Sequence, residues 1–153
     1  HVLKTNGDFV PSLERSDWII QLHTTRQRGL LLRGHVKIDE IMPEIPSERL
    51  REAMRGGAAP FIMRPESREQ IERVTALHVL SACRLAYTYT TGNVGSKPEA
   101  AKWATDTFPE YKPVLMEAIQ KRGSFEIAPY GSAYDFIDSV FELLKEAHDA
   151  PSV

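Results

Sequence analysis

Two basic side chains in the middle of the chain, Lys97 and Arg84, are candidates for binding an anion, and His78 nearby is a third candidate for chemistry. Lys97 follows the turn 92–96 and stands where a helix is expected to begin, a place where free backbone N–H groups and a lysine charge together suit a phosphate. Arg84 lies within an apolar segment, where a guanidinium needs an anionic partner or a polar cavity to offset its desolvation. His78 precedes Arg84 by six residues and is a candidate ligand contact or proton carrier.

Each of these side chains also has an ordinary structural interpretation, which the local pattern alone favours. Lys97 fits a solvent-exposed lysine at a helix start, because a bare Gly-Ser-Lys sequence lacks the glycine-rich loop that identifies a P-loop. Arg84 fits an internal salt bridge, and His78 fits a core histidine whose hydrogen bonds are satisfied.

Acidic and nucleophilic groups give weaker signals. Glu66, Glu69 and Glu72 recur every three residues and would share one helix face, which is either a solvated face or a binding surface for a cationic ligand. The five histidines have no recognisable metal-ligand spacing, so we expect no metal held by this chain. No serine lies in a G-x-S-x-G setting and no Cys-His arrangement follows from the sequence, so no catalytic residue is assigned.

Composition predicts an ordinary globular chain. The 153 residues are 42% hydrophobic and 26% charged, with a net charge of -2, which gives no reason to expect nucleic acid as a partner. No apolar run is long enough to cross a membrane, and the single cysteine, Cys83, favours a cytoplasmic location. The chain does not begin with Met and shows no signal peptide, so we expect a processed chain or a piece of a longer protein.

The first part of the chain predicts short elements separated by proline and glycine. The dipeptide at 6–7 predicts a hairpin or a loop crossing, and the capping pattern from Ser16 to Gly29 predicts a helix, with a strand at 18–22 as the alternative. Residues 30–32 are expected to form a short buried connector, and Ser47 is expected to open a helix that two glycines close at 56–57.

The second part predicts a helical bundle. A long central helix is expected from 66 to 91, ended by Gly92, because its second half is apolar on almost every side. Three further helices are expected at 98–107, 112–122 and 132–148. The short connections predict antiparallel packing of neighbours.

The segment 76–119, "ALHVLSACRLAYTYTTGNVGSKPEAAKWATDTFPEYKPVLMEAI", closely resembles the helical C-terminal domain of the streptomycin/spectinomycin adenylyltransferases. The segment "DWIIQLHTTRQRGLLLRGHVKIDEIMPEIPSERLREAM" resembles the family's join between two domains, so the resemblance covers nearly the whole chain. It implies a mainly α fold: an antiparallel bundle of about five helices over 65–153, preceded at 1–64 by the junction with, and a short β/loop remnant of, an N-terminal nucleotidyltransferase domain. The shared marks are Arg84, Thr91-Gly92, Ser96-Lys97, Ala100-Ala101, Trp103-Ala104, Pro109, Tyr111 and Pro113-Val114-Leu115.

The resemblance also implies a division of labour in the whole enzyme. The family's N-terminal domain carries a Gly-Ser loop and an Asp-x-Asp pair that holds magnesium for ATP, and this chain has no such motif. ATP and magnesium would thus belong to the full-length enzyme, with neither held by this chain alone. Lys97 matches a lysine that reaches the nucleotide phosphates, and Arg84 matches an arginine that is either structural or a phosphate partner.

Two departures from the family bear on its ligands. Streptomycin-modifying members have a tryptophan and acidic residues before the central helix, whereas this chain has no tryptophan there. Glu69, Glu72 and His78 are therefore the candidate substrate contacts, by position only. In the family, a tyrosine lies near the nucleotide, and the position that matches it in this sequence is Gly123.

These observations lead to two hypotheses. In the first, the chain is the substrate- and nucleotide-contacting domain of an aminoglycoside-type adenylyltransferase, which transfers AMP from ATP to a hydroxyl and is inactive without its nucleotidyltransferase domain. Its partners would be that domain, ATP and a cationic aminoglycoside-like molecule, with no nucleic acid and no membrane. In the second, the chain is a non-enzymatic interaction or regulatory module of the same descent, and residues 30–32, left uncovered, could form a homodimer contact.

Overall fold

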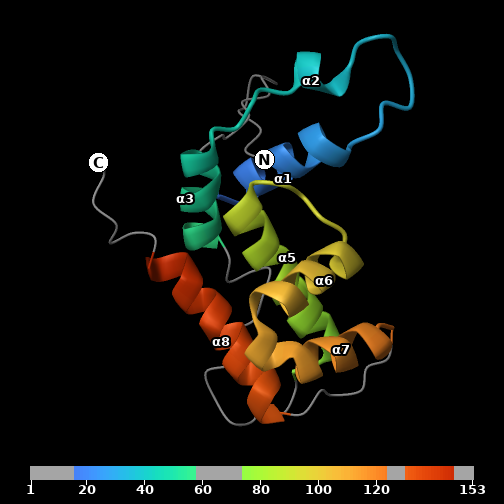
Figure 1. Cartoon of the computed structure of the whole chain (residues 1–153). Helices are drawn as coiled ribbons and strands as arrows, with labels where there is room; N and C mark the ends of the chain where they lie inside the picture. Colours follow the sequence, from blue (N-terminus) through green and yellow to red (C-terminus); the bar gives the residue numbers. More distant parts are fainter. Residues whose placement is uncertain (1–15, 58–73, 124–129, 147–153) are drawn as a thin grey trace, which may run out of the picture. The chain divides into compact units, whose positions relative to one another are not determined.

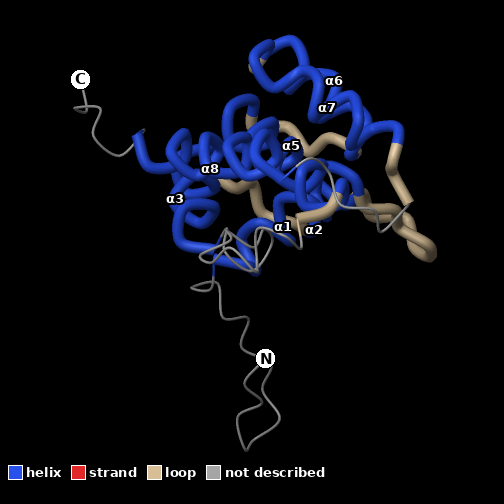
Figure 2. The backbone as a smooth tube through the Cα atoms, turned by 90° about the horizontal axis from the view of Figure 1, so that it is seen from below, coloured by secondary structure: helices blue, strands red, loops and turns tan. Residues whose placement is uncertain are grey.

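The computed structural model describes residues 16–57, 74–123 and 130–146 (Figure 1). This part of the chain consists of helices joined by loops and turns, and no strand occurs in it (Figure 2). The predicted mainly α fold is confirmed. The chain divides into two compact units, His1–Gly57 and Ala58–Val153, which are considered separately below.

The described part of the first unit is built on the packing of two helices. Arg26 donates hydrogen bonds to the backbone carbonyls of Asp39 and Met42, which ties the first helix to the short second one. Ile19, Leu50 and Met54 are buried where the first and third helices pack. The three helices are α1 (Ser16–Arg28), α2 (Ile38–Ile41) and α3 (Ser47–Gly57).

The sequence predicted two of the three described helices of this unit. The helices starting at Ser16 and Ser47 are confirmed, and the strand alternative at 18–22 is wrong. The buried connector at 30–32 is also wrong, because Leu30 and Leu32 are 86% and 95% exposed. The predicted hairpin at 6–7 lies outside the described residues, and α2 was not predicted.

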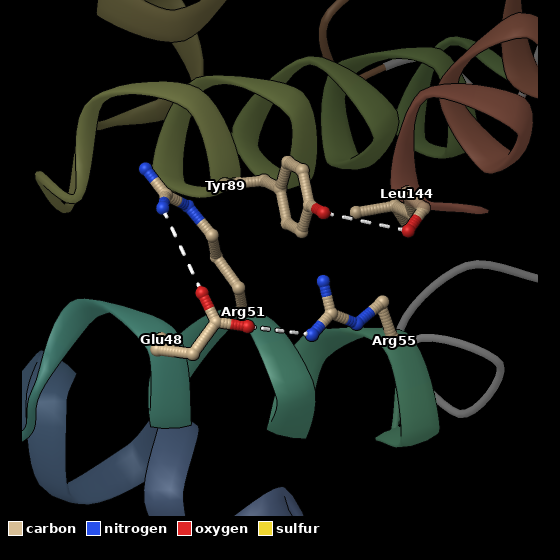
Figure 3. Close-up of polar contacts among 5 residues, drawn as sticks. All are labelled: Glu48, Arg51, Arg55, Tyr89 and Leu144. Atoms are coloured by element: carbon tan, nitrogen blue, oxygen red, sulfur yellow. Dashed lines mark hydrogen bonds and ion pairs between the residues drawn. The ribbon is translucent and has the colours of Figure 1, made fainter. Parts of the chain in front are cut away.

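On α3, Glu48 lies between two arginines (Figure 3). Its carboxylate is 2.9 Å from the guanidinium of Arg55 and 4.0 Å from that of Arg51. Glu48 and Arg51 are exposed and Arg55 is partly buried, so both pairs lie at the surface of this unit and add little to stability.

The second unit is arranged around one helix. That helix, α5, packs against α6, α7 and α8, and Figures 1 and 2 show α8 on one side of it and α6 with α7 on another. Close packing is possible because the facing residues are small. Ala82 and Ala86 of α5, and Ala100 and Ala104 of α6, have no exposed surface. The elements are α5 (Ala76–Thr91), α6 (Lys97–Thr107), the 3-10 turn η1 (Pro109–Tyr111), α7 (Lys112–Gln120) and α8 (Tyr130–Glu146).

A chain of aromatic rings connects these helices. Phe136 of α8 is fully buried and makes edge-on contacts with Phe108 and Tyr111, with ring centroids 5.8 and 5.4 Å apart. Phe108 in turn contacts Trp103, and Trp103 contacts Tyr87 of α5. At the far end of α8, the hydroxyl of Tyr89 donates a 3.4 Å hydrogen bond to the carbonyl of Leu144 (Figure 3). Because both residues lie near the C-terminal ends of their helices, this hydrogen bond brings the C-terminal ends of α5 and α8 together.

The central helix is shorter than predicted. It begins at Ala76, because Thr75 is extended, with φ -113° and ψ 167°, and its backbone N–H donates a 3.1 Å hydrogen bond to Nδ1 of His78. A single helix from 66 to 91 is therefore wrong, although residues 66–73 themselves lie outside the described part. The predicted end is confirmed, with Gly92 in the left-handed region at φ 71°. The three later helices are confirmed to within two residues at each described end.

The aromatic chain predicts which core substitution costs most. Phe136→Ala removes a fully buried ring and two ring contacts, so we expect a loss of about 3 to 5 kcal/mol in the free energy of unfolding. Phe136→Leu keeps most of the volume and should lose less. Urea denaturation followed by circular dichroism measures both, and equal losses for the two variants would contradict the packing described here.

Candidate anion-binding site

The position of Lys97 depends on a close approach between the turn 92–96 and α5. Gly95 is buried, and a Cβ atom added to it would lie 2.9 Å from Cε1 of Tyr87. The turn thus rests directly on the ring of Tyr87, which is itself held by the edge-on contact with Trp103 at 5.6 Å. Any side chain at position 95 would push the turn away from α5. Glycine is therefore required here by the close contact with Tyr87 and not by an unusual φ.

The start of α6 is fixed by a capping box. The hydroxyl of Ser96 accepts a 3.4 Å hydrogen bond from the N–H of Glu99, and the carboxylate of Glu99 accepts a 2.7 Å bond from the N–H of Ser96. Pro98 has no N–H, and the N–H of Ala100 donates to the carbonyl of Ser96. The first turn therefore offers few free N–H groups, and an anion at this point must be bound mainly by side chains.

Arg84 lies close to Lys97 because of this arrangement. Arg84 stands three residues before Tyr87, on the same side of α5, and the turn that carries Lys97 rests on Tyr87. Burial lowers the pKa of the Lys97 ammonium, and the positive charges of Arg84 and Arg122 lower that pKa further. Arg122 follows the end of α7, which packs against both α5 and α6. Three helices thus bring three cations together.

The charges of this cationic cluster, defined as Arg84, Lys97 and Arg122, are not neutralised by the described residues. No ion pair joins any of the three to a carboxylate within 16–57, 74–123 and 130–146. The internal salt bridge expected for Arg84 is not found in this part of the chain. Like charges held together repel, so the cluster favours the binding of an anion with more than one charge.

His78 has a capping role at the other end of α5. Its Nδ1 accepts the N–H of Thr75 and lies 3.0 Å from the Thr75 hydroxyl, so the neutral ring carries its proton on Nε2. Burial lowers the pKa of the imidazole, and the charge of Lys97 lowers it further. His78 is consequently neutral near pH 7, and its role as a substrate contact stays a prediction.

Two other predicted contacts, Glu69 and Glu72, lie outside the described residues. Within the described part, no group of three or more His, Cys, Asp or Glu side chains is arranged to hold a metal ion. No described helix is both long enough and apolar enough to cross a membrane. The sequence analysis missed Arg122, whose nearness to Lys97 depends on the packing of α7 and has no local signature.

Comparison with known proteins decides the family. A family model described as "Aminoglycoside adenylyltransferase, C-terminal domain" matches residues 40–149, which is well over half of the chain. The chain belongs to this family. The resemblance inferred from the sequence is confirmed.

Curated relatives agree with this assignment to the aminoglycoside adenylyltransferase C-terminal domains. An "Aminoglycoside (3'') (9) adenylyltransferase" from Rhizobium radiobacter is 31% identical over 115 residues, which cover 74% of this chain and 41% of the relative. Proteins of the same name from Klebsiella pneumoniae and Shigella flexneri are 30% identical over 115 residues, 74% of this chain and 42% of each relative. The chain thus matches about two fifths of the length of these proteins.

The lowered pKa of His78 predicts a pH dependence of stability. In the unfolded chain the imidazole has an ordinary pKa of about 6.5, and in the folded domain its pKa is lower. As the pH falls, the unfolded state therefore binds a proton before the folded state does. Below about pH 6.5, the contribution of His78 to the free energy of unfolding decreases. Above that pH the contribution is fully present.

His78→Gln is a suitable comparison because glutamine at this position can still accept the N–H of Thr75 as the third residue of a capping box. We expect the variant to lose less stability than the parent between about pH 7 and pH 5. Chemical denaturation at a series of pH values measures this, and parallel curves for the two proteins would show that His78 keeps an ordinary pKa.

Proposed function

We propose that this domain binds the polyphosphate of ATP and forms one side of the active-site cleft in an enzyme that transfers AMP to a hydroxyl of an aminoglycoside. The observation that carries the proposal is the cationic cluster, whose members have no carboxylate partner in the described residues. Lys97 is the central member, because the charges of Arg84 and Arg122 both act on it. Its place at the start of α6 is fixed by Gly95 and by the capping box of Ser96.

The chemistry of AMP transfer suits such a cluster. The reaction breaks the bond between the α- and β-phosphates of ATP, and negative charge increases on the departing pyrophosphate. Cations held in place before the reaction stabilise that charge without further reorganisation. In this proposal Lys97 and Arg84 bind and orient the polyphosphate, and they do not exchange protons with the acceptor hydroxyl.

The remaining chemistry is proposed to lie outside this chain. The sequence has no Gly-Ser loop followed by an Asp-x-Asp pair, and the described residues show no metal-binding group. In the whole enzyme, residues of the nucleotidyltransferase domain would hold magnesium. The metal would neutralise the negative charge of the phosphate oxygens. We therefore expect the 153-residue chain to have no transferase activity by itself.

Substrate binding in the proposal rests on the family assignment and on charge. An aminoglycoside is a polycation, and carboxylates attract it over long distances. Glu69 and Glu72 are the proposed contacts, and His78 can offer its Nε2–H as a hydrogen-bond donor. The cationic cluster itself would repel the ammonium groups of an aminoglycoside, so these groups should lie toward the proposed acidic contacts while the acceptor hydroxyl reaches the α-phosphate in the same cleft.

A second candidate is an interaction module without transferase activity. One observation favours it: Leu30 and Leu32, in the first unit, are almost fully exposed, as expected of residues that a partner covers. The reading frame upstream of His1 separates the candidates. A Gly-Ser loop with an Asp-x-Asp pair supports the enzyme, and a natural start supports the module.

Lys97→Ala tests the proposed nucleotide contact. In the protein extended upstream to include its nucleotidyltransferase region, we expect this variant to bind ATP with magnesium about ten- to one-hundredfold more weakly, the usual loss for a hydrogen bond to a charged group. Isothermal titration calorimetry measures the affinity. Lys102→Ala is the matched control, because Lys102 is an exposed lysine on the same helix.

The proposal predicts a large loss for Lys97→Ala and almost none for Lys102→Ala. If both variants bind ATP as well as the parent, Lys97 does not contact the nucleotide. If the extended protein itself binds no ATP, the interaction-module candidate is favoured instead.

A further inference from the structure

Arg122 occupies an unusual position among the basic residues of the second unit. It follows the last turn of α7, where its N–H donates a 3.4 Å hydrogen bond to the carbonyl of Ile119, and its side chain is exposed. The next residue, Gly123, has φ 101°, so the chain turns away from the helix immediately after Arg122.

The neighbouring lysine provides a direct contrast. Lys121 forms an ion pair with Glu117, with 3.0 Å between Nζ and Oε1. Arg122 forms no ion pair with any carboxylate in the described residues, and its charge acts on Lys97 instead. The two adjacent basic residues therefore differ. Lys121 is paired with a carboxylate of its own helix, whereas Arg122 lies near another positive charge.

The packing of the unit explains this convergence. The helix α7 packs against both α5, which carries Arg84, and α6, which begins at Lys97. Only Phe108 and the turn η1 separate α6 from α7, so α7 returns alongside α6 and its C-terminal end lies on the same side as the start of α6 (Figure 1). A basic residue at the C-terminal end of α7 is ordinarily explained by the helix dipole, which attracts cations to the last carbonyl groups. That explanation accounts for Lys121 and Arg122 equally, and it does not account for the nearness of Arg122 to Lys97.

We propose that Arg122 is a third polyphosphate-binding side chain of this domain, which contacts the same phosphate chain as Lys97 and Arg84. The inference rests on the proposed function of the cluster. It adds a residue at the C-terminal end of a third helix. A guanidinium there can bind two phosphate oxygens at once and adds a positive charge.

This arrangement also makes the site selective for the number of phosphates. Three cations from three helices match an extended anion with several charges, such as a triphosphate or tripolyphosphate. A nucleoside monophosphate presents one phosphate group and cannot engage all three at once. Removal of Arg122 should therefore weaken the binding of ATP and tripolyphosphate more than that of AMP.

The test uses tripolyphosphate as the probe and the 153-residue chain as the protein. NMR shifts of the backbone amides of Gly95 and Ser96, which are present in every variant, give the dissociation constant. We expect Arg122→Gln to weaken binding roughly three- to tenfold at low ionic strength, where exposed charges are least screened. Lys121→Gln, which removes the same charge one residue away, should change the affinity less than twofold, because Lys121 is already paired with Glu117.

Lys97→Gln separates this inference from the proposed function. If Lys97→Gln weakens binding while Arg122→Gln behaves like Lys121→Gln, the cluster binds polyphosphate without Arg122 and only the present inference fails. If the parent shows no shift with tripolyphosphate, or Lys97→Gln binds as tightly as the parent, the proposed function fails together with it. Arg122→Lys should restore most of the affinity lost in Arg122→Gln, and failure to do so would show that the loss does not come from the charge.

Discussion

The close approach of the turn 92–96 to α5 determines where the candidate site lies. Gly95 has no side chain, so the turn rests on the ring of Tyr87, and Tyr87 is held by Trp103 from the following helix. The capping box of Ser96 and Glu99 then starts α6 at one defined residue, Lys97. A local packing constraint thus places a cation on the same side of α5 as Arg84.

The electrostatics of the second unit follow from this placement. The capping box uses the carboxylate of Glu99 and part of the backbone N–H groups at the start of α6, so the helix terminus itself offers little to an anion. An anion at this point would therefore be bound by the side chains of Arg84, Lys97 and Arg122. Burial lowers the pKa of Lys97, the charges of Arg84 and Arg122 lower it further, and an anion would relieve the repulsion among the three cations.

The sequence predicted those features that depend on local signals. Gly92 marked the end of the central helix, and Ser16 and Ser47 marked the starts of α1 and α3, because helix ends are decided within a few residues. The start of the central helix was misjudged, since the helical pattern continues across Thr75 and only its hydrogen bond to His78 shows the break.

The sequence predicted only those residues of the candidate site that have a local signal. Lys97 and Arg84 could be found because they lie in segments that carry the family resemblance. Arg122 could not, because its nearness to Lys97 arises from the packing of α7 against two other helices. The exposure of residues 30–32 likewise depends on what covers them, and an apolar sequence alone does not reveal this.

The most direct test of the account is the pKa of Lys97 with and without tripolyphosphate, measured by NMR from the chemical shift of its Cε during a pH titration. In the free protein the pKa should lie below the ordinary lysine value, because of burial and the two guanidinium groups. Bound polyphosphate would stabilise the charged ammonium, so the account predicts that the pKa of Lys97 rises when the anion is added. A pKa that stays the same at saturating tripolyphosphate would contradict the claim that this cluster binds phosphate.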